Sequence, residues 1–172
     1  MLFEADSFWS PDQEPQNPPL TPDLILTAEQ SLGVKLPSLL LDLLRALNGG
    51  YTRGFVFPTT RRTRWAADHV PFDELFGIGS SDPNDSRVPT NIMSTPYMTL
   101  EWGLPNNQVI LSGDGHWITL DYRNSIEPTV AWIDTGSGQD VILAPTFGAF
   151  IDGLLPDDVV DEETGRLRSG GA

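Results

Sequence analysis

Residues 108–144 read QVILSGDGHWITLDYRNSIEPTVAWIDTGSGQDVILA, and this stretch decides the fold of the chain. Four runs within it are rich in β-branched and aromatic residues and are separated by turn residues, a pattern typical of consecutive antiparallel strands. The four runs are QVILS, HWITLDY, TVAWID and DVILA. The stretch therefore predicts a four-stranded β-meander.

The dipeptide Asp114-Gly115 lies between the first two runs and favours a two-residue type I′ turn, a turn that needs positive φ at both positions. Such a turn fixes the register of the two strands. One side of the ribbon then carries the pairs Gly113–His116, Leu111–Ile118 and Val109–Leu120. Because the large side chains of these pairs are apolar, we expect this side to face the core. The opposite side carries the pairs Ser112–Trp117, Ile110–Thr119 and Gln108–Asp121.

This register separates the polar residues of GDGHWITLDYR, residues 113–123. His116 and Asp121 fall on opposite sides of the strand and about 17 Å apart along it, so they cannot share a metal ion or act as an acid–base pair. The chain has two histidines and no cysteine, whereas a zinc site takes three or four ligands. We therefore expect no metal and no cofactor.

The sequence lacks the motifs of several common enzyme classes. It contains no G-x-S-x-G elbow, no P-loop and no G-x-G-x-x-G after a strand. We therefore expect a binding protein without catalytic residues. A hydrolase with an unrecognised site stays an alternative, and joint substitution of Asp114, His116 and Asp121 tests it.

Helical patterns precede and follow the meander. Thr21 can cap a helix that Gly33 closes, a second helix runs from Pro37 to the turn Asn48-Gly49-Gly50, and Thr146 caps a last helix. A short helix is expected within residues 91–102, and a short strand within residues 54–58. The order predicts an α+β domain whose mainly antiparallel central sheet has helices packed on one face.

Both ends of the chain read as loose segments. Residues 11–19 are rich in proline and polar residues, and residues 156–172 are acidic with no periodic apolar face. We expect a flexible extension over residues 1–20, one domain over residues 21–155 and a flexible acidic tail over residues 156–172. The absence of cysteine and of a signal-peptide pattern at the start fits a cytoplasmic protein.

The formal net charge is −14, and acids outnumber bases in the middle of the chain as well as at its ends. Such a surface repels nucleic acids and anionic membranes and attracts basic partners. We therefore expect a protein partner and no direct contact with nucleic acid or membrane. Acidity that only keeps the protein in solution is the alternative interpretation. Arg61, Arg62 and Arg64 are expected to form a solvated loop.

Four segments together resemble the SUKH superfamily, which unites yeast cell-wall assembly regulators with bacterial immunity proteins. In chain order they are AEQSLGVKLPSLLLDLLRALNGGY (28–51), GDGHWITLDYR (113–123), EPTVAWID (127–134) and ILAPTFGAFIDGL (142–154). The positions that match the pattern are Glu29, Gly33, Leu36, Pro37, Asn48, Gly49, Gly50, Asp114, Gly115, Leu120 to Arg123, Phe147, Phe150, Ile151 and Leu154. Thr146 stands where the family usually has serine, and residues 52–105 match only loosely.

The resemblance implies an α+β fold and an immunity protein, which binds a cognate secreted toxin domain and neutralises it inside the producing cell. Many such toxins are nucleases, whose phosphate-binding surfaces are basic, so an acidic antidote matches them in charge. The alternative is a non-catalytic regulatory scaffold of the cell-wall assembly regulator type, whose terminal arms recruit partners.

We expect the toxin to contact outward side chains of the meander and the exposed aromatic and acidic residues near them. The candidate contact residues are Glu101, Trp102, Asp114, His116, Trp117, Asp121, Tyr122, Arg123, Trp132 and Asp134. Two of these assignments have an alternative. Trp117 and Trp132 would be packed in the interior if they follow the usual burial of tryptophan, and Asp121 with Arg123 would form a local ion pair at the strand end.

Overall fold

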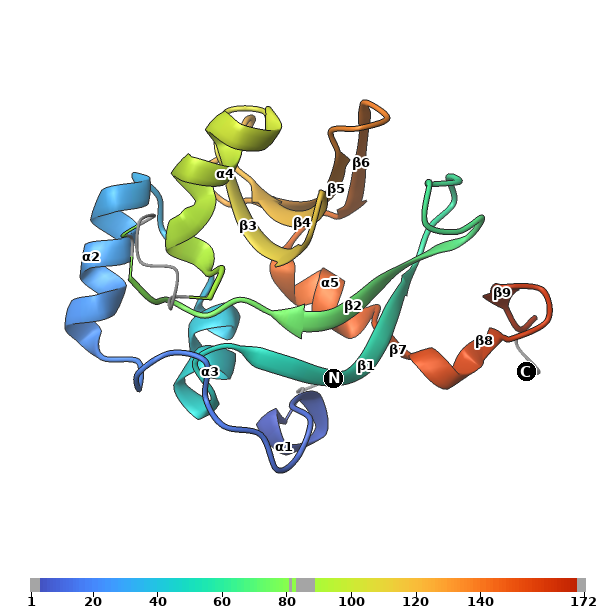
Figure 1. Ribbon diagram of the computed structural model, residues 1–172, viewed down its shortest axis with the longest axis horizontal. Coiled ribbons are helices and arrows are strands. Elements are labelled where there is room, and N and C mark those ends of the chain that lie inside the picture. The colour runs from blue at the N-terminus through green and yellow to red at the C-terminus, as the bar shows by residue number, and fades with distance from the viewer. Residues whose placement is uncertain (1–3, 81, 83–88, 170–172) are drawn as a thin grey trace.

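The computed structural model describes residues 4–80, 82 and 89–169 and shows an α+β fold, as the sequence predicts (Figure 1). Its first half contains α1 (Ala5–Phe8), α2 (Pro22–Leu32), α3 (Ser38–Ala46), β1 (Gly50–Pro58), β2 (His69–Leu75), η1 (Ile92–Ser94) and α4 (Thr95–Trp102). Its second half contains β3 (Gln108–Gly113), β4 (His116–Asp121), β5 (Thr129–Asp134), β6 (Gln139–Ala144), α5 (Phe147–Asp152), β7 (Leu155–Pro156), η2 (Asp157–Val159), β8 (Val160–Asp161) and β9 (Arg166–Leu167).

The strands form antiparallel sheets. The predicted meander is the four-stranded sheet β3-β4-β5-β6, a second sheet has the order β2-β1-β7, and β8 pairs with β9. The second sheet extends the expected strand at residues 54–58 to nine residues and pairs it with His69–Leu75. The segment that follows β2 lies alongside the meander, where the backbone N–H of Phe76 donates to the carbonyl of Leu111 in β3.

The predicted register of the first hairpin holds at its base and fails at its tip. Gln108, Val109 and Ile110 pair with Asp121, Leu120 and Thr119 as expected, but a bulge at Leu111 places Ser112 opposite Ile118 and Gly113 opposite Trp117. The carbonyl of Leu111 is taken by Phe76 outside the meander, which accounts for the extra residue.

The turn itself also differs from the type I′ expectation. Positive φ occurs at Gly113 and Gly115 and not at Asp114. A Cβ at Gly113 would clash with the carbonyl oxygen of His116, so this close approach requires glycine.

The helix caps lie where the sequence places them. The Thr21 hydroxyl accepts from the N–H of Leu24, Gly33 ends α2 in the left-handed conformation, and the Thr146 hydroxyl accepts from the N–H of Ala149. The helix expected within residues 91–102 is present as η1 followed by α4. These signals are local, so they are readable without knowledge of the tertiary fold.

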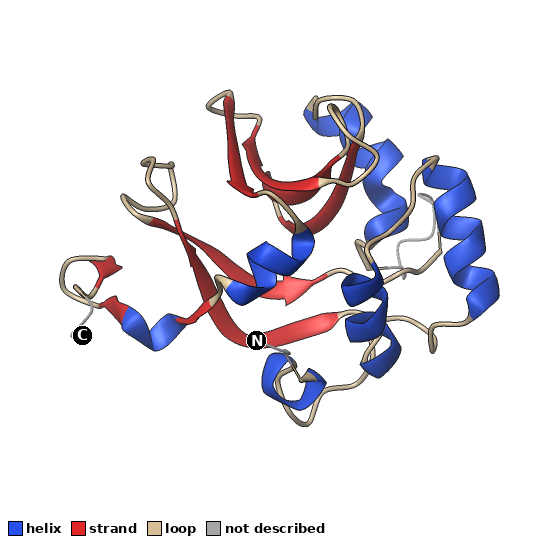
Figure 2. Cartoon of the chain, turned by 180° about the vertical axis from the view of Figure 1, so that it is seen from behind, coloured by secondary structure: helices blue, strands red, loops and turns tan. Residues whose placement is uncertain are grey.

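The helix α5 lies between the two larger sheets (Figure 2), and its buried side chains belong to the core. The Phe150 ring packs on Phe57 and Phe72 of the second sheet, with centroids 4.9 and 5.0 Å away, while α5 also contacts β5 and β6 of the meander. On the other face of the meander, α4 places Trp102 against Trp117 in a T-shaped contact. Helices therefore lie on both faces of the meander, whereas the sequence predicted helices on one face of the sheet.

Residues 4–20 belong to the packed domain, which corrects the expectation of a flexible extension. The Phe8 side chain is fully buried and stacks on Phe55, and the Trp9 indole N–H donates to the carbonyl of Leu43. The composition of residues 11–19 gives no sign of these contacts, because they depend on two aromatic side chains that precede the proline-rich run. The boundary at residue 20 therefore cuts through the core.

The boundary at residue 155 also divides an element of structure. Leu155 and Pro156 form β7, which pairs with Val56 and Phe55 of β1. Beyond it, β8 and β9 form a small hairpin, and the N–H of Leu167 donates to the carboxylate of Asp68. Residues 156–169 thus have defined partners on the domain, although none of these residues is buried.

A buried asparagine ties the first part of the chain to the segment that follows β2. The Asn48 side chain accepts from the N–H of Ile78 and donates to the carbonyls of Ile78 and Pro18, while its own carbonyl accepts from the side chain of Asn17. Gly77 lies so close to the carbonyl of Asn48 that a Cβ would clash with it. This network gives a structural reason for the Asn48-Gly49-Gly50 turn.

Candidate functional site

The ten contact residues expected from the sequence separate into interior and surface groups. Trp117 and Trp132 are 2% and 1% exposed, so the expectation that they present their rings to a partner is wrong. Trp117 is covered by α4, and Trp132 is covered by His116, whose ring stacks on it at 4.8 Å. The alternation of inward and outward positions along the strands did not predict this burial, because other side chains cover both tryptophans.

Asp121 and Arg123 form the local ion pair that was the alternative interpretation. Arg123 bridges two carboxylates, with nitrogen–oxygen distances of 2.7 Å to Asp121 and 2.6 Å to Asp140. Burial alone raises the pKa of Asp121, but hydrogen bonds from Arg123 and Gln108 outweigh it, so this pKa lies below its ordinary value. The hydrogen bonds to Asp140 and Asp121 raise the pKa of Arg123. The cluster joins β4 to β6 and is structural.

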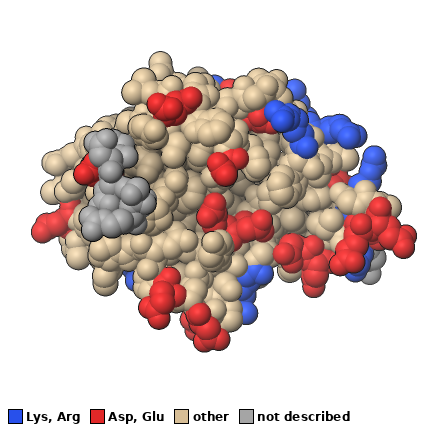
Figure 3. Space-filling view, viewed as in Figure 1, with Lys and Arg blue, Asp and Glu red and all other residues tan. Residues whose placement is uncertain are grey.

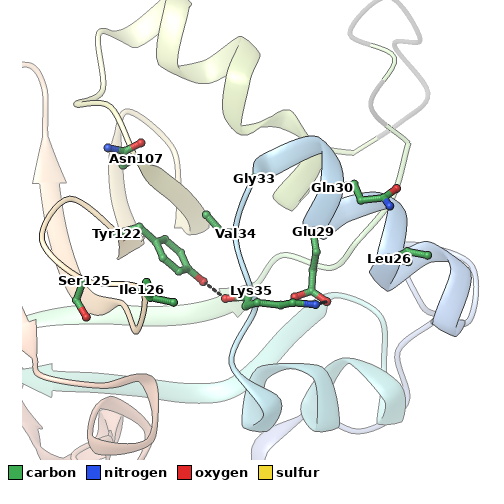
Figure 4. Close-up of a pocket in the computed structure, with 10 residues that line it drawn as sticks. All are labelled: Leu26, Glu29, Gln30, Gly33, Val34, Lys35, Asn107, Tyr122, Ser125 and Ile126. Carbon is green, nitrogen blue, oxygen red and sulfur yellow. Dashed lines mark hydrogen bonds and ion pairs between the residues drawn. The ribbon is translucent and has the colours of Figure 1, made fainter.

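Tyr122 lies in a groove between α2 and the β4–β5 loop (Figure 4). The groove has a volume of about 540 Å³ and exposes Leu26 and Ile126. The Tyr122 hydroxyl donates to the carbonyl of Lys35, and burial followed by the nearby Glu29 raises the pKa of that hydroxyl. Glu29 in turn accepts from the N–H of Leu36 and lies 3.7 Å from the Lys35 ammonium group. These polar groups are paired with one another, and their contacts hold α2 and the segment after it to the sheet.

The other candidates meet in a hollow at the open end of the meander. It has a volume of about 640 Å³ and is lined by Trp102, Asp114, His116, Trp132 and Asp134 from the expected set. Asp134 lies 3.5 Å from Arg64 and accepts from the N–H groups of Gly136 and Ser137, so its carboxylate is largely committed. Glu101, the remaining candidate, is exposed next to Trp102 on α4.

His116 is the centre of an aromatic stack in this hollow. Its ring lies between Trp132 in the interior and Trp65 in the β1–β2 loop, whose centroid is 5.5 Å away. The loop is held in place by Gln139, which accepts from the N–H of Arg64 and donates to the carbonyl of Arg62. Trp65 is thereby fixed over the meander while half of its surface stays open.

A second hollow of about 330 Å³ adjoins the first and shares Trp65, Asp114, His116 and Trp132 with it. Its other wall comes from the second sheet and includes Tyr51, Asp73 and Glu74. Tyr51 and Glu74 are directly opposed in the β1–β2 pairing. The two sheets therefore build one continuous concave surface around His116.

Carboxylates dominate the charge of this second hollow. Desolvation raises the pKa of Glu74 first, and the neighbouring Asp73 and Asp114 raise it further. Desolvation also raises the pKa of Asp73, with a further contribution from Asp157. Figure 3 shows acidic side chains across the middle of this view, over β2, and basic side chains gathered over the β1–β2 loop.

We call this concave surface the His116 face. It consists of the aromatic residues Tyr51, Trp65, Trp102 and His116 and the acidic residues Asp73, Glu74 and Asp114. Tyr51, Trp65 and Trp102 are 60%, 51% and 46% exposed, so three large rings lie open around the two adjoining hollows. The sequence identified Trp102, Asp114 and His116, and missed the others because they lie on a distant strand pair and loop.

The groups on the His116 face suit binding by stacking and by charge. Within the described residues, no side chain hydrogen-bonds the His116 ring, and no group of three or more His, Cys, Asp or Glu side chains is placed to hold a metal ion. The exposed rings offer flat apolar surface, and the carboxylates offer acceptors for a cationic group. No helix in the described part of the chain is long and apolar enough to cross a membrane.

Comparison with known families gives a match over most of the chain. The model of the family SUKH_6, described as SMI1-KNR4 cell-wall, matches residues 22–151. This range runs from α2 to α5 and contains every residue of the His116 face. No curated protein matches the chain.

Proposed function

Because the chain belongs to the SUKH_6 (SMI1-KNR4 cell-wall) family, we propose that it is an immunity protein that binds and neutralises a cognate secreted toxin domain. The family includes immunity proteins and its members are generally non-catalytic. The proposal assigns the contact with the toxin to the His116 face. Trp102, Asp114 and His116 are the contact residues kept from the sequence, and Tyr51, Trp65 and Glu74 are added to them.

The observation that supports this assignment is the combination of exposed aromatic rings with a concave acidic surface. Tryptophan and tyrosine are enriched among the few residues that supply most of the binding energy at protein interfaces. On this chain the backbones at Trp65 and Tyr51 are both held, the first in the loop fixed by Gln139 and the second in strand β1. An interface centred on them needs little rearrangement of the free protein, which favours affinity.

The charge of the chain supports a basic toxin domain. The net charge of −14 speeds the encounter with a positive partner over a long range, and the acidic His116 face provides the complementary local field. A nuclease domain is one class of toxin with the required basic surface. We place the action of the protein in the cytoplasm of the producing cell, where an antidote meets the toxin before its release.

Co-expression of the chain with the toxin domain encoded beside it tests the proposal. Wild-type protein is expected to restore growth, and a variant carrying Trp65→Ala with Asp114→Asn is expected to fail while keeping its melting temperature. Asp23→Asn with Glu127→Gln is a control at exposed acids away from the His116 face, and it should protect like wild type. Binding of a partner without any protection would favour the regulatory scaffold instead.

A further inference from the structure

The acidic part of the His116 face lacks a counter-charge. Among the described residues, Asp73, Glu74 and Asp114 have no ion-pair partner. Burial and the neighbouring carboxylates of Asp73 and Asp114 disfavour the charged form of Glu74 and raise its pKa, although a hydrogen bond from the backbone of Gly113 acts in the other direction. Like charges held close together in a partly buried site are destabilising, so a bound cation would relieve them.

The geometry disfavours a metal ion as that cation. A metal needs several ligand atoms converging on one point, and no such group of acidic side chains exists in the described part of the chain. The carboxylates of Asp73 and Glu74 come instead from β2, and that of Asp114 comes from the turn between β3 and β4. A guanidinium group is planar and has five donors in a fork, so it can serve separated carboxylates at once.

Aromatic rings line the same hollow beside these carboxylates. Trp65 and Tyr51 line it with exposed rings, and arginine stacks on such rings more readily than lysine does.

The neighbouring hollow already uses this chemistry. There the chain's own Arg64 places a guanidinium nitrogen 3.5 Å from the carboxylate of Asp134, beside Trp65 and His116. The second hollow shares Trp65, His116 and Trp132 with it and has more carboxylates, but no arginine of the described chain lines it.

We propose that the hollow between Tyr51, Trp65, Glu74 and Asp114 binds an arginine side chain of the partner protein. This inference rests on the proposed function, since it names the chemistry by which the His116 face recognises a basic toxin domain. The guanidinium lies over the Trp65 ring and donates to Glu74 and Asp114. Asp73 adds to the negative field at the entrance.

The test is a titration of the full chain with the capped peptide acetyl-Gly-Arg-Gly-amide, in which the NMR signal of the Trp65 indole N–H reports binding. We expect a saturable shift with arginine, weaker binding of the lysine peptide and no shift with the neutral citrulline peptide. Glu74→Gln with Asp114→Asn is expected to weaken binding about tenfold, and Trp65→Ala about two- to fivefold. Asp23→Asn with Glu127→Gln changes the net charge equally and should leave binding within about twofold.

Three results would overturn the proposal: citrulline binding as well as arginine, no saturable shift at Trp65, or unchanged arginine binding by the Glu74 and Asp114 variant. Loss of the fold does not obscure the outcome, because removing half-buried negative charge should leave the melting temperature unchanged or higher. The toxin assay separates this failure from failure of the proposed function. Protection that depends on Trp65 without arginine binding refutes only the inference, and arginine binding without protection refutes only the function.

Discussion

Replacing Asn48 with alanine tests how the first part of the chain is joined to the segment that follows β2. The Asn48 side chain is buried and makes three hydrogen bonds, at 2.8 Å from the Ile78 N–H and at 2.7 and 3.0 Å to the carbonyls of Pro18 and Ile78. Alanine leaves these three backbone groups without their partner. Each bond contributes about 1 kcal/mol net, so the variant should lose about 3 kcal/mol of unfolding free energy.

The assay is thermal unfolding followed by circular dichroism at neutral pH. For a chain of this length, a loss of about 3 kcal/mol lowers the melting temperature by roughly 6–12 °C. Asn106→Ala is the matched control, because Asn106 is exposed and only its backbone carbonyl accepts a hydrogen bond, from Gln108. Asn48→Asp should be at least as unstable as Asn48→Ala, since a carboxylate cannot donate to the two carbonyls. A melting temperature of Asn48→Ala within about 2 °C of wild type would refute the reasoning.

Three further predictions concern the core and the titration of two carboxylates. Phe8→Ala should lower the unfolding free energy, measured by urea denaturation, by about 3–5 kcal/mol, because the ring is fully buried against Phe55. An unchanged urea midpoint would instead support a flexible N-terminal extension. The folded pKa of Asp121 is lowered, so its contribution to stability is present above the ordinary aspartate pKa and is lost as pH falls through the folded value. Asp121→Asn should therefore reduce the fall of the melting temperature with decreasing pH. An unchanged fall of the melting temperature would contradict the ion pair with Arg123. The folded pKa of Glu74 is raised, so the wild-type protein should gain stability as pH falls through that pKa, while Glu74→Gln should not. Equal pH profiles of the two melting temperatures would contradict a destabilising negative charge on Glu74.

Much of the fold is written in local sequence signals. Thr21 and Gly33 bound α2, Thr146 begins α5, and the four alternating runs form the meander. The bulge at Leu111 is not predictable from the hairpin alone, because it depends on a hydrogen bond from Phe76 in another segment. Such long-range pairings have no fixed spacing in the sequence.

The site was predictable only in part, for a related reason. Asp114 and His116 belong to the recognisable hairpin, so the sequence pointed to them. Tyr51, Trp65 and Glu74 lie on a strand pair and loop that pack beside the hairpin only in the folded chain. Burial of Trp117 and Trp132 was misjudged because α4 and the His116 ring cover the two faces of the hairpin.

The most direct test of the His116 face is the dissociation constant of the complex between the full chain and its toxin domain, measured by calorimetry. For Trp65→Ala with Asp114→Asn we predict binding at least about 30-fold weaker than wild type, the effect of losing residues central to an interface. The control Asp23→Asn with Glu127→Gln should bind within about twofold of wild type. A folded Trp65 and Asp114 variant that binds the toxin as tightly as wild type would contradict the assignment of the interface.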